Sequence, residues 1–262
     1  MGPKNRRFAL VFRSLLAALY TLRSIAIHTG NKHIKQLLSL VMKSLLASLT
    51  ACQNGENTYK VSEIELYAQN IFSRASEIDN VFKNMTIALE YLYEKGYNES
   101  KYDFSEHHAF HVENFLLRLT SLVDRCYLLA GTTMLMENHK IECLGGNKKI
   151  YKQLAEFSPP SASLLKDMEG TIENLRETRN KVAHQSGFSS KNLGVLRAIE
   201  NANKESVSVK HITDLLSHEE IKDIVIEDAF EPFNEVLTKM NELVEQLIDS
   251  LSFVYTGLLE RI

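Results

Sequence analysis

The chain has 262 residues, which is enough for one or two domains with a real hydrophobic core. Its hydrophobic content of 44% and charged content of 24% are ordinary for a globular protein. Cys52, Cys126 and Cys143 are widely spaced and form no CxxC pair, which excludes the usual zinc patterns and a disulfide framework and favours a reducing, cytoplasmic location.

Charge is distributed unevenly along the chain. Residues 1–55 carry eight basic residues and no acidic one, whereas the rest of the chain carries 22 basic and 33 acidic residues. A basic arm on an acidic body predicts either an anionic partner for the arm or association of the arm with the body.

The N-terminal arm has some features of a targeting segment. Basic residues precede an apolar run, but Arg13 and Arg23 interrupt that run, and Lys43 interrupts the apolar region before a lipoprotein-like "LTAC". We therefore expect no stable membrane span and interpret residues 1–55 as two basic amphipathic helices packed on the body. The alternative is a membrane-surface protein held by residues 1–52.

Apolar residues recur at spacings of three and four along almost the whole chain, which is the pattern of amphipathic helices. Ser62 with Glu65 forms a capping box that opens one long helix. Ser217 with Glu220 forms a second capping box, among the shorter helical pieces of 188–229. The expected helices cover 8–28, 34–51, 62–92, 106–137, 162–186, and the stretch from Pro232 to the C-terminus.

Several shorter segments depart from this pattern. Clusters of Gly, Pro, Asn and Ser predict loops, and the only strand-like run predicts a small hairpin at most. The expected loops are 53–58, 144–149 and 157–163, and the strand-like run is 205–212.

These elements predict an all-α fold, a four-helix bundle with an extra N-terminal helical pair. We expect residues 1–55 to form the basic pair and residues 60–262 to form the bundle. Shorter helical pieces in 188–229 are then an insertion before the last helix.

One residue breaks the apolar stripe of the helix expected over 162–186. The stripe runs through Leu165, Met168, Ile172, Leu175, Arg179 and Val182, so an arginine occupies a core position. A guanidinium stays charged, so a buried one must be paired or must face a polar cavity. Either Asp124 or Glu113 pairs with it and His184 caps the helix, or Arg179 serves a functional site.

The stretch "RNKVAH" (179–184), late in one helix of an all-α bundle, resembles the signature of the HEPN superfamily. That signature is Arg-x4–6-His, commonly with a polar residue such as Asn180 directly after the arginine. The resemblance covers roughly residues 60–262. It implies a HEPN-like four-helix bundle that acts as a metal-independent endoribonuclease without a cofactor. It also implies a homodimer in which two motifs form one composite site.

The same resemblance implies a place in defence, toxin–antitoxin or RNA-processing systems. A protein partner or antitoxin then accompanies the RNA partner. Many relatives are inactive and serve as RNA-binding or scaffold modules, which is the alternative function. Some HEPN toxins carry a Tyr two residues after the histidine, where an antitoxin modifies it; here that position is Ser186, which argues against this form of regulation.

The chemistry of the motif fits RNA cleavage independently of the resemblance. Histidine can act as general base or acid near neutral pH, which is the role expected of His184, and the guanidinium of Arg179 can bind two phosphate oxygens. Asn180 orients the histidine or the phosphate. Arg176 and Lys181 supply a local basic cleft for RNA. Attack by a 2′-hydroxyl excludes DNA as substrate.

A second cluster, "EHHAFH" (106–111), places His107 and His111 four residues apart on one helical face. Such a pair binds a metal only with further ligands, and none is evident nearby apart from Glu106. We therefore interpret both as surface histidines and predict no metal site.

Overall fold

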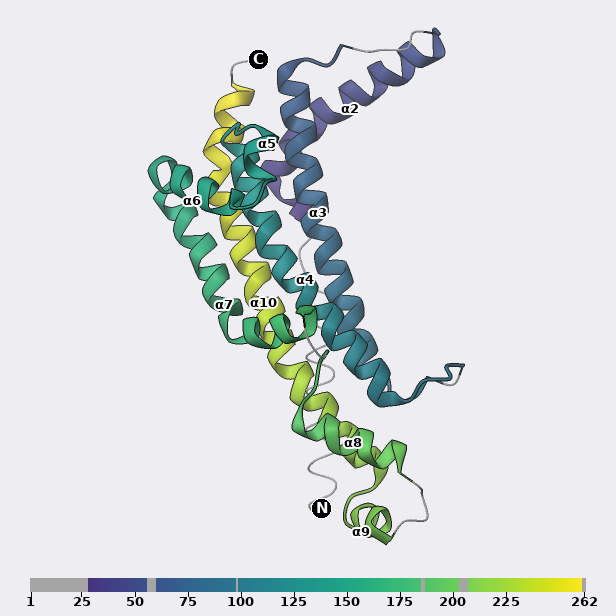
Figure 1. Ribbon diagram of the computed structural model, residues 1–262. Helices are drawn as coiled ribbons and strands as arrows, with labels where there is room; N and C mark the ends of the chain where they lie inside the picture. Colours follow the sequence, from purple (N-terminus) through teal and green to yellow (C-terminus); the bar gives the residue numbers. More distant parts are fainter. Residues whose placement is uncertain (1–27, 56–59, 98, 185–186, 203–206, 261–262) are drawn as a thin grey trace, which may run out of the picture. The chain divides into compact units, whose positions relative to one another are not determined.

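A computed structural model describes residues 28–55, 60–97, 99–184, 187–202 and 207–260 (Figure 1). Within these ranges the chain is all-α and contains no strand, which confirms the predicted fold class. The elements are η1 (His28–Gly30), α2 (Lys32–Gln53), α3 (Glu63–Leu92), α4 (Phe104–Thr133), α5 (Asn138–Ile141), α6 (Gly146–Phe157), α7 (Pro159–His184), α8 (Lys191–Asn201), α9 (Val207–Leu215) and α10 (His218–Leu259).

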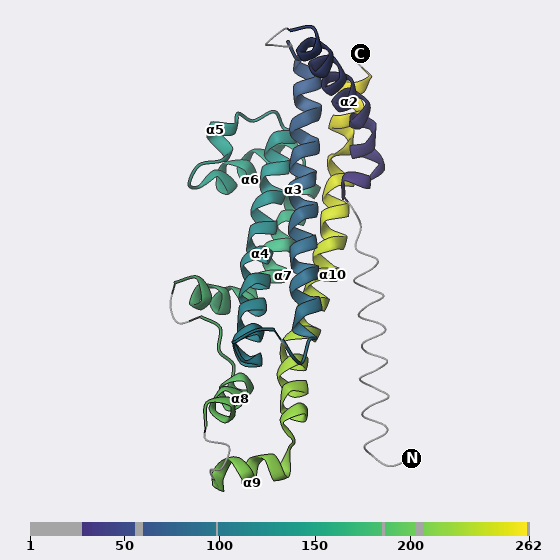
Figure 2. The same ribbon diagram turned by 90° about the vertical axis from the view of Figure 1, so that its right-hand side faces the viewer.

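The described chain divides into two compact units, and four long helices contribute one segment to each. Unit 1 comprises Lys83–Thr120 and Ile172–Thr238, and unit 2 comprises residues 28–82, Ser121–Thr171 and 239–260. Figure 2 shows the four helices, α3, α4, α7 and α10. The expected helix over 8–28 lies outside the described residues except for His28, and the division at residues 55–60 stays a prediction.

Unit 1 has an aromatic core between α3, α4 and α10. The rings of Phe115 and Phe233 stack with centroids 4.4 Å apart, and Tyr93 meets Phe230 edge-on at 4.2 Å. Leu193 and Leu196 of α8 are also buried, so this short helix packs as part of the unit. The core of unit 1 is therefore built from residues whose spacing is helical in every segment.

Unit 2 is held by aliphatic packing and a buried hydroxyl cluster. Thr133 Oγ1 lies 2.9 Å from the hydroxyl of Tyr255, and Tyr67 donates to the Thr133 carbonyl at 3.3 Å. Burial raises the pKa of Tyr67 and of Tyr255 well above the ordinary range, so both hydroxyls stay protonated and act as neutral hydrogen-bonding groups.

Helix α10 is much longer than predicted. It begins at His218, directly after a capping box in which Ser217 and Glu220 bond each other's backbone amides at 3.3 and 2.9 Å, and it continues through Pro232. The prediction that the helix starts near Pro232 is therefore wrong. A proline removes one backbone donor, and the burial of Phe230 and Phe233 on either side outweighs that loss.

Three predicted non-helical segments are also wrong in part. Pro159 opens α7, because the first helical positions need no backbone donor, so most of 157–163 is helical. The expected loop 144–149 ends early, since α6 starts at Gly146 after Gly145 turns the chain at φ 79°. Residues 207–212, expected in a strand-like run, belong to helix α9.

Candidate functional site

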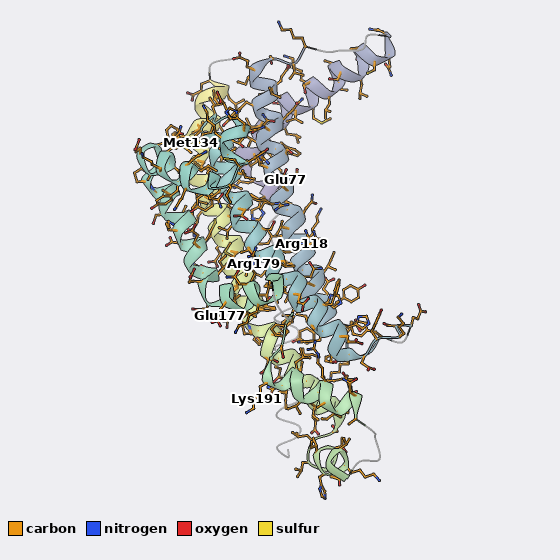
Figure 3. The ribbon with its side chains drawn as sticks, in the orientation of Figure 1. Glu77, Arg118, Met134, Glu177, Arg179 and Lys191 are labelled. Carbon is orange, nitrogen blue, oxygen red and sulfur yellow. The ribbon has the colours of Figure 1, made fainter. Side chains whose placement is uncertain are left out.

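The candidate site lies in unit 1, where the last part of α7 packs beside α4. Arg179 is half-buried and lines a small hollow together with Leu116, Leu119, Thr120, Ile172 and Leu175. The stripe along α7 therefore places the arginine against apolar side chains, as its spacing predicts. Figure 3 shows Arg179 on α7 and Arg118 on α4.

The guanidinium of Arg179 is only partly satisfied. Its Nη1 donates to Asn180 Oδ1 at 3.1 Å, while its Nε is buried and has no partner among the described residues. A buried donor without an acceptor costs free energy, which a bound anion at this position would recover.

The two carboxylates considered as partners of Arg179 accept hydrogen bonds from other groups. Glu113 Oε1 accepts the backbone amide of Phe188 at 2.6 Å, and Asp124 Oδ1 accepts Asn147 Nδ2 at 2.8 Å in unit 2. The hydrogen-bond partner of Arg179 is thus a neutral amide, and its positive charge is not neutralised by a carboxylate within the described part of the chain.

Glu113 was expected as a possible partner of Arg179, but it bonds the backbone after α7 instead. Its carboxylate holds the backbone just after α7, where Gly187 adopts φ 77°, and a Cβ at Gly187 would lie 2.7 Å from Glu113 Oε1. The available signal was Gly187, which directly follows the helix expected over 162–186. The sequence could not reveal that α4 supplies the acceptor.

The remaining motif residues lie at the end of α7. His184 is the last residue of the helix, Asn180 is exposed, and the side chains of Arg176 and His184 lie outside the described part of the structure. Lys181 Nζ pairs with Glu177 Oε1 at 2.8 Å on the exposed face. The hydrogen bond and the charge of Lys181 lower the pKa of Glu177.

The histidine pair of α4 is packed among aromatic rings. His107 stacks on Tyr97 at 3.8 Å and His111 stacks on Tyr91 at 5.0 Å, with the two imidazoles 6.5 Å apart. His107 Nε2 also lies 2.8 Å from Ser100 Oγ. Within the described ranges, no group of three or more His, Cys, Asp or Glu side chains is arranged to hold a metal ion.

Comparison with known proteins identifies the family. The model of the HEPN_Cthe2314-like HEPN family matches residues 56–252, a range that includes the whole of α7 and the stretch 179–184. No curated protein and no solved structure matches the chain significantly. The match spans well over half of the chain, and the chain belongs to the HEPN_Cthe2314-like HEPN family.

Proposed function

We propose that this HEPN protein is a metal-independent endoribonuclease whose site contains Arg179, Asn180 and His184. The observation that carries the proposal is the state of Arg179. Its guanidinium lines a hollow at the end of α7, bonds only a neutral amide and keeps a buried Nε without a partner among the described residues. This is the state expected of an arginine that binds a phosphate oxygen.

The proposed reaction is attack by a 2′-hydroxyl on the adjacent phosphorus. The 2′-oxygen forms a bond to phosphorus and the bond to the 5′-oxygen breaks, which leaves a 2′,3′-cyclic phosphate and a 5′-hydroxyl. One imidazole takes the 2′-proton and another protonates the leaving oxygen. Arg179 stabilises the extra negative charge on the phosphorane.

Asn180 acts on Arg179 in this proposal. Its Oδ1 already accepts the hydrogen bond from Arg179 Nη1, so it sets the direction of the guanidinium. Arg176 and Lys181 are proposed RNA contacts. Lys181 must leave its pair with Glu177 to bind a phosphate, and an exposed pair of this kind costs little to break.

A single motif supplies one histidine, whereas the reaction uses an acid and a base. We propose that a two-fold homodimer brings two copies of His184 into one composite site. In the cell the protein would act in the cytoplasm within a defence or toxin–antitoxin system, with RNA as substrate and a protein partner or antitoxin as regulator.

The test is cleavage of total RNA in the presence of EDTA. The wild-type protein is compared with His184→Ala and Arg179→Ala, and Arg74→Ala, which removes an ion-paired arginine of unit 2, serves as the matched control. We expect fragments with 2′,3′-cyclic phosphate ends from the wild type and the control. Cleavage should slow by about 10²–10⁴-fold in His184→Ala.

The alternative function, a non-catalytic module that binds RNA or protein, gives the opposite result. RNA then stays intact with every folded variant. A module that binds RNA retards RNA on a gel, whereas a module that binds only protein does not. Intact RNA with folded, dimeric wild-type protein would overturn the nuclease proposal.

A further inference from the structure

Helix α2 belongs to unit 2 and has one buried side. Its buried side includes Ile34, Leu37 and Val41, and Ser44 bonds Gln69 of α3. At its start, Asp79 accepts hydrogen bonds from the backbone amides of His28 and Thr29 at 2.7 and 3.1 Å. These contacts determine which side of α2 faces the rest of unit 2 and which side faces solvent.

A second side of α2 is apolar and faces solvent. Met42, Leu45, Leu46 and Leu49 are exposed by 48%, 49%, 60% and 62%, and their spacing gathers them in one sector at about 100° per residue. In the described part of the chain, α2 is also the one helix long and apolar enough to cross a membrane. Four adjacent large apolar side chains in water indicate a surface that is covered by a partner.

The charges around this apolar side indicate which partner covers it. At about 100° per residue, Lys35 lies on the same side as these apolar residues, nearer the start of α2, and Lys32 lies beside them. Lys43 pairs with Glu65 of α3 at 3.7 Å, and residues 1–55 contain no acidic residue. A second copy of α2, or the basic stretch 8–26 of the same chain, would bring like charges together. An anionic lipid surface accepts both the leucine side and the lysines.

We propose that α2 lies in the plane of an anionic membrane, with its exposed apolar side chains among the acyl chains and with Lys32 and Lys35 at the headgroups. The helix does not span the bilayer in this arrangement, because its buried side packs against the rest of unit 2. This inference is independent of the proposed nuclease activity.

The experiment is co-sedimentation of the full chain with vesicles. Phosphatidylcholine vesicles with and without phosphatidylserine are compared at low and high salt. We expect binding to the anionic vesicles only, weakened by salt. The variant Leu45→Gln/Leu46→Gln/Leu49→Gln should bind at least about tenfold more weakly, since three side chains no longer enter the lipid.

The matched control is Leu117→Gln/Leu144→Gln/Leu215→Gln, which changes three exposed leucines outside α2 and should bind as the wild type does. Circular dichroism and RNA cleavage should be the same for both variants. Three results would overturn the proposal: no binding of the wild type to anionic vesicles, undiminished binding of the α2 variant, or a change in the oligomeric mass of the α2 variant, which would show that a second copy covers this side.

Discussion

The carboxylate of Glu113 fixes the chain where α7 ends, because it accepts the amide of Phe188 at 2.6 Å. Gly187 lies between this contact and the motif helix with φ 77°, a conformation that side chains with a Cβ rarely adopt. A Cβ at this position would lie 2.7 Å from Glu113 Oε1, so the Glu113 side chain would have to shift.

We therefore expect Gly187→Ala to lower the free energy of unfolding by about 1–3 kcal/mol, through backbone strain and displacement of Glu113. Urea denaturation measures the change. Gly170→Ala is the control, since Gly170 lies inside α7 with open space around it and alanine should be neutral or stabilising there. Equal effects of the two substitutions would contradict this explanation.

His108 is a buried histidine of α4 that stacks near Phe104. Burial is the main reason that its pKa falls from 6.5 to about 4, and the positive charges of His111 and Arg197 add to the effect. Between these two values the unfolded chain binds a proton that the folded chain does not bind.

Stability should therefore decline as the pH falls from 6.5 toward 4, and His108→Leu should remove part of this decline. The expected contribution is at most about 1.4 kcal/mol per pH unit. Urea midpoints at several pH values test it, with the exposed His139→Leu as control. A pH profile that is the same in His108→Leu and the wild type would show that His108 does not titrate in this way.

At the scale of helices, hydrogen-bonded N-terminal caps determine where a helix begins. In α3 the hydroxyl of Ser62 accepts the amide of Glu65 at 3.4 Å, and the Glu65 carboxylate accepts the amide and hydroxyl of Ser62 at 3.0 and 2.8 Å. This reciprocal pattern matches the box that the sequence predicts at 62–65.

Ser62→Ala should cost about 1 kcal/mol of unfolding free energy, because the Glu65 amide loses its acceptor. Chemical denaturation provides the measurement. Ser73→Ala, on the exposed face of the same helix, should have little effect or stabilise slightly. If both serines tolerate alanine equally, the box does not stabilise α3.

The helical period predicts α3, α4 and α7 to within a few residues, because each carries a long apolar stripe that is buried. The first third of α10 is not predicted, because proline is disfavoured inside a helix and the sequence does not show that Phe230 and Phe233 are buried. For α9, β-branched residues at alternating positions indicated a strand, and no neighbouring strand exists among the described residues to pair with it.

The candidate site shows the same limit at finer scale. A stripe predicts that Arg179 meets apolar neighbours, and the hollow around it agrees. Which carboxylate bonds which donor depends on distances between helices, and those are not encoded in spacing along one helix. In the structure Glu113 accepts a hydrogen bond from the amide of Phe188, although the sequence suggested Glu113 as a partner for Arg179.

At the scale of the whole molecule, the nuclease proposal requires a dimer. Light scattering should give a mass of twice the chain's 29.8 kDa at concentrations where RNA is cleaved. A mass of one chain, in a preparation that cleaves RNA, would show that both proton transfers occur without a second copy of His184.

The division of each long helix between two units has a consequence for synthesis on the ribosome. Unit 1 needs residues up to Thr238, and unit 2 needs the segment that begins at Lys239, so a nascent chain completes neither unit before Thr238 has been made. The motif at 179–184 thus emerges before the helix segments it packs with are all available. Proteolysis of stalled chains would show this delay as protease sensitivity that persists until α10 has left the exit tunnel.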